Sequence, residues 1–472
     1  MSDKARLPVI RTASEKVSAG REYPPVVTSP VRRAAAFALV GSLGLIVPLV
    51  GEVNEPAVAT LLAIAPFLIV AIFALSVNAD SVFFELFARP GDRRDGTLYG
   101  LAGFSLAAAG TAVLAVEFGM PPAIFVGTLF LLSIGNLSGQ LFRRLTGDPI
   151  LATGGFVAGG FLAGIGGQVV TAAITGNTVP WQSVTFLAAS GSLLAALLRE
   201  ALFKRDDALV LVSVALLLWF LGVLPVEIST TRIVAALGVT VLLGYISFAL
   251  KTASLPGMLT GVLLGLLTIV LGDYGWFAML IAFFGIGGLA SKFRYDRKLA
   301  RGIAEENEGA RGTGNVLANS LVALFAVVGA AASHSIGVPD TIFFFAFAGA
   351  VGAALADTLS SEIGGLYDNP RLITTLEVVE PGTDGAVTWQ GEVVGVAGAA
   401  IVALIAVFTF ENVTVVSGLA IVAAGVAGMT VDSLLGATIE GWLCGNQGVN
   451  FLATLAAAIV GAALASVFGL PV

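Results

Sequence analysis

The stretch Thr341-Ile-Phe-Phe-Phe-Ala-Phe-Ala-Gly-Ala-Val-Gly-Ala-Ala-Leu-Ala-Asp-Thr-Leu-Ser360 decides the fold class. It has no charged residue before Asp357, and a helix needs about 20 mostly apolar residues to cross the hydrocarbon core of a bilayer. The stretch therefore predicts a membrane-spanning helix whose last turns bring polar side chains to one membrane face.

The composition extends this prediction to the whole chain. Of its 472 residues, 57% are hydrophobic and 12% are charged, and the mean hydropathy is +0.95. Soluble proteins carry about 25% charged residues, so the sequence predicts an integral membrane protein. The net charge of −7 argues against nucleic acid as a partner.

Apolar runs of membrane-spanning length follow one another with short breaks. They predict an all-α, polytopic membrane protein of about fifteen helices. The expected spans are 34–50, 57–78, 97–116, 122–142, 150–173, 182–198, 208–224, 229–249, 256–272, 275–291, 314–334, 341–360, 392–410, 415–434 and 450–469.

The basic residues predict the orientation. With this count, Lys and Arg fall in the loops on the side of the N-terminus, and only Arg232 falls on the other side. Basic loops favour the cytoplasm. We therefore expect a multi-pass protein of the cell membrane, with its N-terminus inside, its C-terminus outside and its polar face cytoplasmic.

Three regions differ in character. Residues 1–30 are polar and basic and are expected to form a disordered cytoplasmic tail. Residues 31–227 form a membrane region of unknown role with few charges. It contains a glycine stripe in 150–173, typical of helix packing. A polar patch in one helix fits interhelical hydrogen bonding and a substrate path equally well: Asn136, Ser138 and Gln140. Residues 228–472 have polar inner loops and are the expected catalytic core.

Two helices of the core each end in an acid–hydroxyl pair. Asp357-Thr358 and Asp432-Ser433 are both predicted at the inner ends of apolar helices. Ser361 and Glu362 follow one turn after the first pair. Interfacial anchoring explains a single carboxylate there, but two such pairs favour Mg²⁺ holding a phosphate group.

Other inner segments suit phosphate groups. Arg311 precedes a helix that begins with small residues and carries Asn315 and Asn319 on one face, and exposed amides at a helix start bind phosphate. Basic residues here also fit a membrane anchor. The glycine turn, Pro381–Gly385, by itself means only a loop. The remaining predicted phosphate-binding residues are Arg371, Thr374, Gly382, Thr383, Asp384, Gly385, Asn446 and Asn450. The sequence contains no Walker loop and no protein-kinase signature.

Over about residues 230–470 the sequence resembles the transmembrane protein 19 family, which includes plant phytyl-phosphate kinase. The resemblance is carried by Gly312–Asn319, Ala356–Gly364, Pro370–Thr375 with Pro381–Gly385, and Asp432–Thr438 with Val449–Phe451. The chain departs from the family at Asp384, where Asn is common, and in its first 227 residues.

The resemblance implies a kinase that adds a phosphate from a nucleoside triphosphate, with CTP as the expected donor, to geranylgeranyl or phytyl phosphate. Asp357 and Asp432 would bind Mg²⁺ with Glu362 in support, and the other polar residues named above would hold the phosphates and head groups. The alternatives are a secondary transporter of an anionic or phosphorylated solute, and a lipid-binding or scaffolding role for the N-terminal half.

Overall fold

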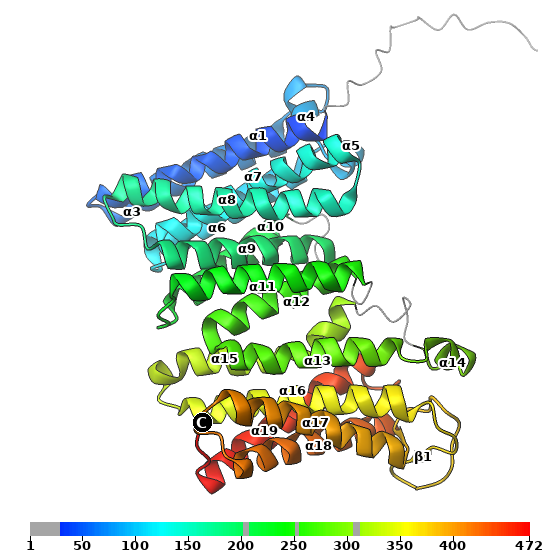
Figure 1. Ribbon diagram of the computed structural model, residues 1–472. Coiled ribbons are helices and arrows are strands. Elements are labelled where there is room, and N and C mark those ends of the chain that lie inside the picture. The colour runs from blue at the N-terminus through cyan, green and yellow to red at the C-terminus, as the bar shows by residue number, and fades with distance from the viewer. Residues whose placement is uncertain (1–28, 202–206, 251–253, 305–311) are drawn as a thin grey trace, which may run out of the picture.

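The computed structural model describes residues 29–201, 207–250, 254–304 and 312–472, and these are almost entirely helical (Figure 1). The tail predicted over 1–30 lies outside the described residues except for its last two, and Arg311 lies outside them as well.

The first half of the chain contains ten α-helices and two short 3₁₀ turns within its described residues. They are α1 (Pro30–Ser42), η1 (Leu43–Leu45), α2 (Ile46–Leu49), η2 (Val50–Glu52), α3 (Pro56–Ser76), α4 (Val82–Phe87), α5 (Pro90–Asp95), α6 (Tyr99–Glu117), α7 (Pro122–Thr146), α8 (Pro149–Thr175), α9 (Trp181–Ala201) and α10 (Asp207–Val223).

The second half adds further helices and one two-stranded antiparallel hairpin. Its elements are α11 (Thr230–Ala249), α12 (Leu255–Leu267), the π-turn η3 (Thr268–Gly272), α13 (Tyr274–Lys292), α14 (Tyr295–Ala300), α15 (Thr313–Ile336), α16 (Asp340–Gly364), β1 (Arg371–Leu372), β2 (Ala386–Val387), α17 (Trp389–Thr409), α18 (Val415–Thr438) and α19 (Asn446–Phe468).

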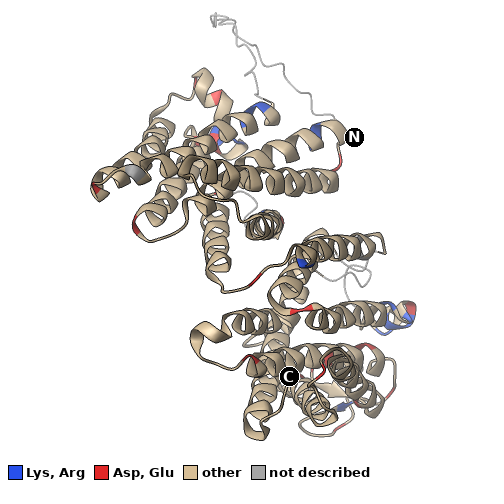
Figure 2. Ribbon diagram, turned by 60° about the vertical axis from the view of Figure 1, so that its left-hand side comes forward, with Lys and Arg blue, Asp and Glu red and all other residues tan. Residues whose placement is uncertain are grey.

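The prediction of an all-α polytopic membrane protein is confirmed. Among the described residues, 13 segments are helical, long and apolar enough to cross a membrane. Two shorter apolar helices, Asp207–Val223 and Thr230–Ile246, occupy the two remaining predicted spans. The number of actual crossings and their orientation stay predictions. Figure 2 shows that charged residues lie mainly at helix ends and in loops.

The surface of α3 fits contact with lipid. Leu61, Ile69 and Ile72 are each more than half exposed, and the helix contains no charged residue. Apolar side chains exposed in this way are unfavourable in water but suit the hydrocarbon of a bilayer. This face of the molecule therefore lies against lipid tails.

Local sequence explains the tight turn between α7 and α8. Gly147 ends α7 in the left-handed conformation, with φ of +70°, which only glycine adopts without strain. The Asp148 carboxylate then accepts a hydrogen bond from the backbone N–H of Ile150 at 2.7 Å, and Pro149 begins α8. This cap and proline start α8 directly after the turn, and the two helices pack against each other.

The glycine stripe of α8 packs against α7, as the sequence predicts. A Cβ atom added to Gly160 would lie 3.1 Å from the carbonyl oxygen of Leu131, and one added to Gly167 would lie 3.1 Å from the Cα of Gly127. Small residues allow this close approach of two backbones. Ser138 of the polar patch also points at this contact, because it faces Gly159.

The long helices run roughly parallel in a stack, from α1 at one end to α18 and α19 at the other (Figure 1). Helix α9 packs against α11 and α12 and so joins the first group of helices to the second. The division of function near residue 228 stays a prediction.

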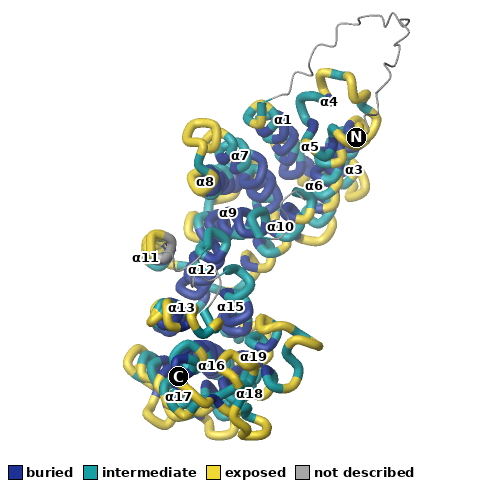
Figure 3. The backbone as a smooth tube through the Cα atoms, turned by 90° about the vertical axis from the view of Figure 1, so that its right-hand side faces the viewer, coloured by how far each residue is buried: buried dark blue, intermediate teal, exposed yellow. Residues whose placement is uncertain are grey.

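Helix α16 is the centre of the second group. It packs against α13, α15, α17, α18 and α19, and most of its residues are buried (Figure 3). Small residues bring its neighbours close. A Cβ atom added to Gly349 would lie 2.7 Å from the carbonyl oxygen of Ala457, and one added to Gly425 would lie 2.8 Å from the Cβ of Ala399. The position of the α16 C-terminal end therefore depends on residues along its whole length.

We expect Gly349→Val to lower the free energy of unfolding by about 1–3 kcal/mol, because its side chain would overpack the α16–α19 contact. Thermal unfolding of the purified protein in detergent measures the loss. Gly110→Val is the matched control, since Gly110 on α6 has no neighbouring atom within 4 Å of an added Cβ. Equal stability of the two variants would contradict this packing.

Candidate functional site

Two carboxyl groups from different helices meet at one end of the second helix group. Asp357 lies near the C-terminal end of α16 and Asp432 near that of α18. Their side chains are hydrogen-bonded to each other. The sequence predicted these two residues as a pair, and the fold brings them into contact because α16 and α18 pack side by side.

This pair of acids has an unsatisfied oxygen. One oxygen of Asp432, Oδ1, is buried without a hydrogen-bond partner in the described part of the chain, and an unsatisfied buried oxygen is costly. Two acidic groups in contact need a shared proton or a cation between them. The hydrogen bond between the two carboxyl groups requires a shared proton in this arrangement. The described residues contain no group of three or more His, Cys, Asp or Glu side chains that could hold a metal, so a cation bound by the pair would have to take its other ligands from water or a phosphate.

The glycine turn lies against α18 beside this pair. Strands β1 and β2 pair antiparallel, with Arg371 opposite Val387, and the loop between them ends at Gly385. A Cβ atom added to Gly385 would lie 2.6 Å from the carbonyl oxygen of Ser433, and the residue has a φ of +74°. Both the close approach and the left-handed backbone require glycine. The loop is thus fixed to the residue that follows Asp432.

A second pair of acids lies where this loop meets the end of α18. Burial raises the pKa of Glu440, and the Asp384 carboxylate raises the pKa further. Asp384 was predicted from the sequence to contact a phosphate, and a carboxylate does this more readily through a cation than directly, because both groups are anionic. Its interaction with Glu440 places it next to the C-terminal end of α18.

The starts of α15 and α19 contact each other. The Nδ2 group of Asn319 donates to the Oδ1 atom of Asn315 at 3.1 Å, and Asn319 is buried. Gly314 packs directly against the Gln447 side chain. Nearby, the hydroxyl of Thr313 is buried without a hydrogen-bond partner among the described residues. The predicted asparagines thus lie at a contact between two helix N-termini.

Glu362 forms an ion pair with Lys298, which lies on the short helix α14. The Lys298 ammonium group also donates to the carbonyl oxygens of Ala290 at 2.7 Å and Ser291 at 3.2 Å. Its side chain is 1% exposed and that of Glu362 is 12% exposed. All three ammonium hydrogens therefore have acceptors, and the pair ties α14 to the ends of α13 and α16.

The other predicted residues lie around these contacts. Arg371 is exposed, and its guanidinium donates to the carbonyl oxygen of Leu376 in its own loop at 2.6 Å. The hydroxyl of Thr383 donates to the carbonyl oxygen of Glu380 at 2.8 Å, and Thr358 is buried in α16. The remaining predicted positions are exposed or partly buried, and their roles stay predictions: Ser361, Thr374, Gly382, Ser433, Asn446 and Asn450.

Comparison with known proteins places this region in a family. Residues 238–458 match the family described as "Integral membrane protein DUF92". An uncharacterized membrane protein of Methanocaldococcus jannaschii is 36% identical over 213 residues, which are 43% of this chain and 82% of that protein. The chain belongs to the DUF92 family of integral membrane proteins.

Two plant proteins are also similar to the chain. The chloroplastic protein VTE6 of Arabidopsis thaliana is 29% identical over 195 residues, covering 40% of this chain and 56% of that protein. Protein PGR of Arabidopsis thaliana is 30% identical over 232 residues, covering 44% and 79%. No solved structure matches the chain. The DUF92 match contains the Asp357–Asp432 pair and leaves the first 237 residues outside it.

Lys298 and Glu440 were not identified as site residues from the sequence. Lys298 lies in a run of basic residues, Lys292–Arg301, that is typical of a membrane anchor, and nothing in the sequence separates it from its neighbours. Glu440 follows the predicted end of a span. Only the packing of α14 on α16, and of the glycine turn on α18, distinguishes these two residues.

Glu362→Gln tests whether this residue holds the fold or takes part in chemistry. We expect the free energy of unfolding to fall by about 3–5 kcal/mol, because Lys298 would keep a buried charge without its partner. Asp368→Asn is the control, since Asp368 is 75% exposed in its pair with Arg301 and should cost at most about 1 kcal/mol. Unchanged stability of Glu362→Gln in thermal unfolding would contradict the structural role.

Glu440 predicts a pH dependence of stability. Its pKa in the folded protein is raised, so its contribution is complete below the ordinary value of 4.5 and is lost as the pH rises through the folded pKa. Glu440→Gln should therefore lose less stability than the parent protein as the pH is raised from about 4 to 8. Melting temperatures across this range measure the difference. Asp384→Asn should reduce the pH dependence of stability in part. Identical pH profiles for all three proteins would refute a role of Glu440 in this dependence.

Proposed function

We propose that this DUF92 protein is a membrane lipid-phosphate kinase. Its substrates would be a nucleoside triphosphate, with CTP as the expected donor, and an isoprenoid monophosphate such as geranylgeranyl or phytyl phosphate. The observation that carries the proposal is the contact between Asp357 and Asp432, made by two membrane helices beside a glycine turn. The family resemblance over this region supports the isoprenoid substrate.

In this reaction the protein itself forms no covalent bond. An oxygen of the lipid monophosphate attacks the γ-phosphorus of the triphosphate, a new P–O–P bond forms, and the nucleoside diphosphate leaves with the electrons of the broken P–O bond. The second pKa of a phosphate monoester is about 6, so the attacking oxygen is already ionised near neutral pH. No general base is needed, and catalysis consists of positioning and charge stabilisation.

The residues of the site suit these two tasks. When bound, Mg²⁺ would neutralise the transferring phosphate groups. Asp357 and Asp432 would hold it, and the turn Gly382–Gly385 would offer backbone N–H groups to the phosphates. The lipid tail would lie between helices, and its head would lie at the end of the bundle where the polar residues gather. In the proposed orientation this end faces the cytoplasm.

We expect Asp357→Asn and Asp432→Asn each to reduce phosphate transfer by about 100-fold or more, because each removes a charge from the reacting centre. The assay follows labelled γ-phosphate from CTP, ATP, GTP or UTP to geranylgeranyl and phytyl phosphate, with and without Mg²⁺. Asp340→Asn is the matched control, because Asp340 lies at the opposite end of the same helix.

Two outcomes would count against the proposal. Full activity of Asp357→Asn would remove this residue from the reacting centre. Absence of transfer by folded parent protein, with all four nucleotides, would reject the kinase. The alternative is then a secondary transporter of an anionic solute, which uptake into liposomes would detect.

A further inference from the structure

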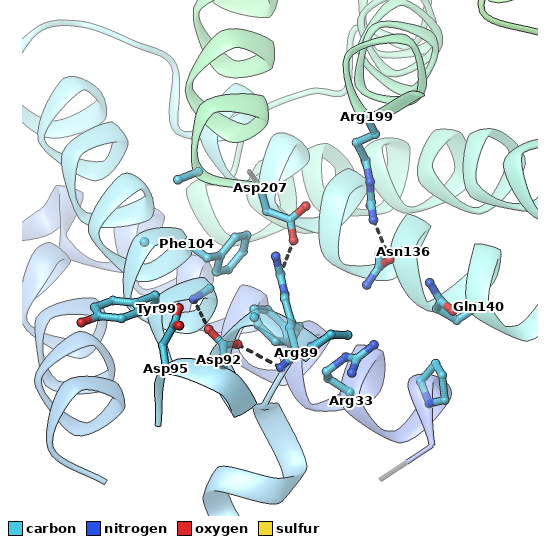
Figure 4. Close-up of a pocket in the computed structure, with 17 residues that line it drawn as sticks. Arg33, Arg89, Asp92, Asp95, Tyr99, Phe104, Asn136, Gln140, Arg199 and Asp207 are labelled. Atoms are coloured by element: carbon cyan, nitrogen blue, oxygen red, sulfur yellow. Dashed lines mark hydrogen bonds and ion pairs between the residues drawn. The ribbon is translucent and has the colours of Figure 1, made fainter. Parts of the chain in front are cut away.

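A second polar pocket lies in the half of the chain outside the family match. We call it the N-terminal pocket; it has a volume of about 580 Å³ and is lined by residues of α1, α5, α6, α7, α9 and α10. Figure 4 shows that Arg33, Arg89, Arg199, Asn136 and Gln140 surround a common space. Three arginines from separate parts of the chain thus converge on one cavity.

The carboxylates that line this pocket are already occupied. Asp92 accepts hydrogen bonds from the backbone N–H groups of Arg89 at 2.9 Å and Gly100 at 3.1 Å, and so holds the turn at the start of α5. Asp95 pairs with Arg94 at 3.0 Å. Asp207 pairs with Arg89. Each acid therefore has a structural partner other than Arg33 and Arg199.

Arg33 and Arg199 have no carboxylate within ion-pair distance among the described residues. Arg33 donates to the carbonyl oxygen of Ala88 at 3.1 Å. Arg199 donates to the Oδ1 atom of Asn136 at 2.9 Å, and its guanidinium lies 4.8 Å from the centre of the Phe156 ring. Both residues are partly buried. Asp92 attracts Arg33 and Asp207 attracts Arg199 only beyond ion-pair distance, while Arg89 repels both. Partly buried cations that repel one another and have no directly bonded carboxylate favour binding of an anion.

The same pocket offers neutral donors. Because the Oδ1 atom of Asn136 accepts from Arg199, its amide nitrogen is left to donate, and Gln140 lies one helical turn further along α7. Each guanidinium presents a planar fork of N–H groups that matches the oxygens of phosphate or carboxylate. Two such forks and two amides approach from different directions, which suits an anion with oxygens on several sides.

We propose that the N-terminal pocket binds a phosphate monoester group, held by Arg33 and Arg199 with Asn136 and Gln140 as further donors. The pocket is larger than a single phosphate ion, so the group belongs to a larger molecule: either a lipid with a phosphate head or a soluble phosphate compound. This site does not depend on the proposed kinase activity, since no residue of the Asp357–Asp432 pair contributes to it.

Calorimetric titration of the full-length protein in detergent tests the proposal. The probes are inorganic phosphate, dioctanoyl phosphatidic acid and, as a lipid without a phosphate monoester, dioctanoyl phosphatidylcholine. We expect the protein to bind at least one of the first two and not the third. Tighter binding of phosphatidic acid than of phosphate would identify a lipid head group, and equal binding would identify a soluble phosphate compound.

Variants test whether the phosphate group binds in this pocket. Arg33→Gln and Arg199→Gln should each weaken binding by about tenfold or more, because each removes a charged hydrogen bond. Gln140→Leu keeps the approximate size of the side chain and removes its amide donor, so it should weaken binding by a smaller factor. If an arginine variant does not fold, Gln140→Leu tests whether the pocket binds the anion. Arg144→Gln removes the same charge from the exposed end of α7 and is the control.

Three results would overturn the proposal. These are no binding of either phosphate probe by the parent protein, unchanged binding in the pocket variants, and an equal loss in Arg144→Gln. The last result would mean that the general positive charge of this membrane face, rather than the pocket, attracts the anion.

Discussion

The close approach of α16 to its neighbours is the constraint on which the second half of the molecule depends. Glycine and alanine at the crossings let backbones come within contact distance, as at Gly349 and Gly425, and dispersion forces over such contacts hold membrane helices together. This packing sets the angle and depth of α16 and α18. It thereby decides that Asp357 and Asp432 touch rather than face lipid or different loops.

The polar groups of the two halves have different kinds of partners. In the second half, carboxyl groups meet each other, and a buried lysine is satisfied by Glu362 and two carbonyl oxygens. In the first half, arginines converge and only one of the three pairs with a carboxylate of the pocket. Like charges thus come together in both halves, and for this reason we propose a cation at the carboxyl pair and an anion at the arginines.

Much of the fold follows from the order of residues along the chain. Runs such as 341–360 reach the length needed to cross a bilayer, and each predicted span coincides with a helix. Prolines and caps such as Asp148 set helix starts through local hydrogen bonds. The acid–hydroxyl pairs were also visible, because Asp357 and Asp432 interrupt stretches that are otherwise apolar. By contrast, Lys298 and Arg199 resemble every other basic residue at a membrane face until their neighbours are known.

The sequence by itself determined the class of protein, the positions of its helices and the two helices that carry acidic ends, since hydropathy and local capping act over short distances. Only the tertiary structure decided which side chains meet. Four features join segments that lie far apart in the chain. They are the Asp357–Asp432 contact, the packing of Gly385 against α18, the Lys298–Glu362 pair and the arginines of the N-terminal pocket. Their positions depend on helix packing, which no local pattern specifies.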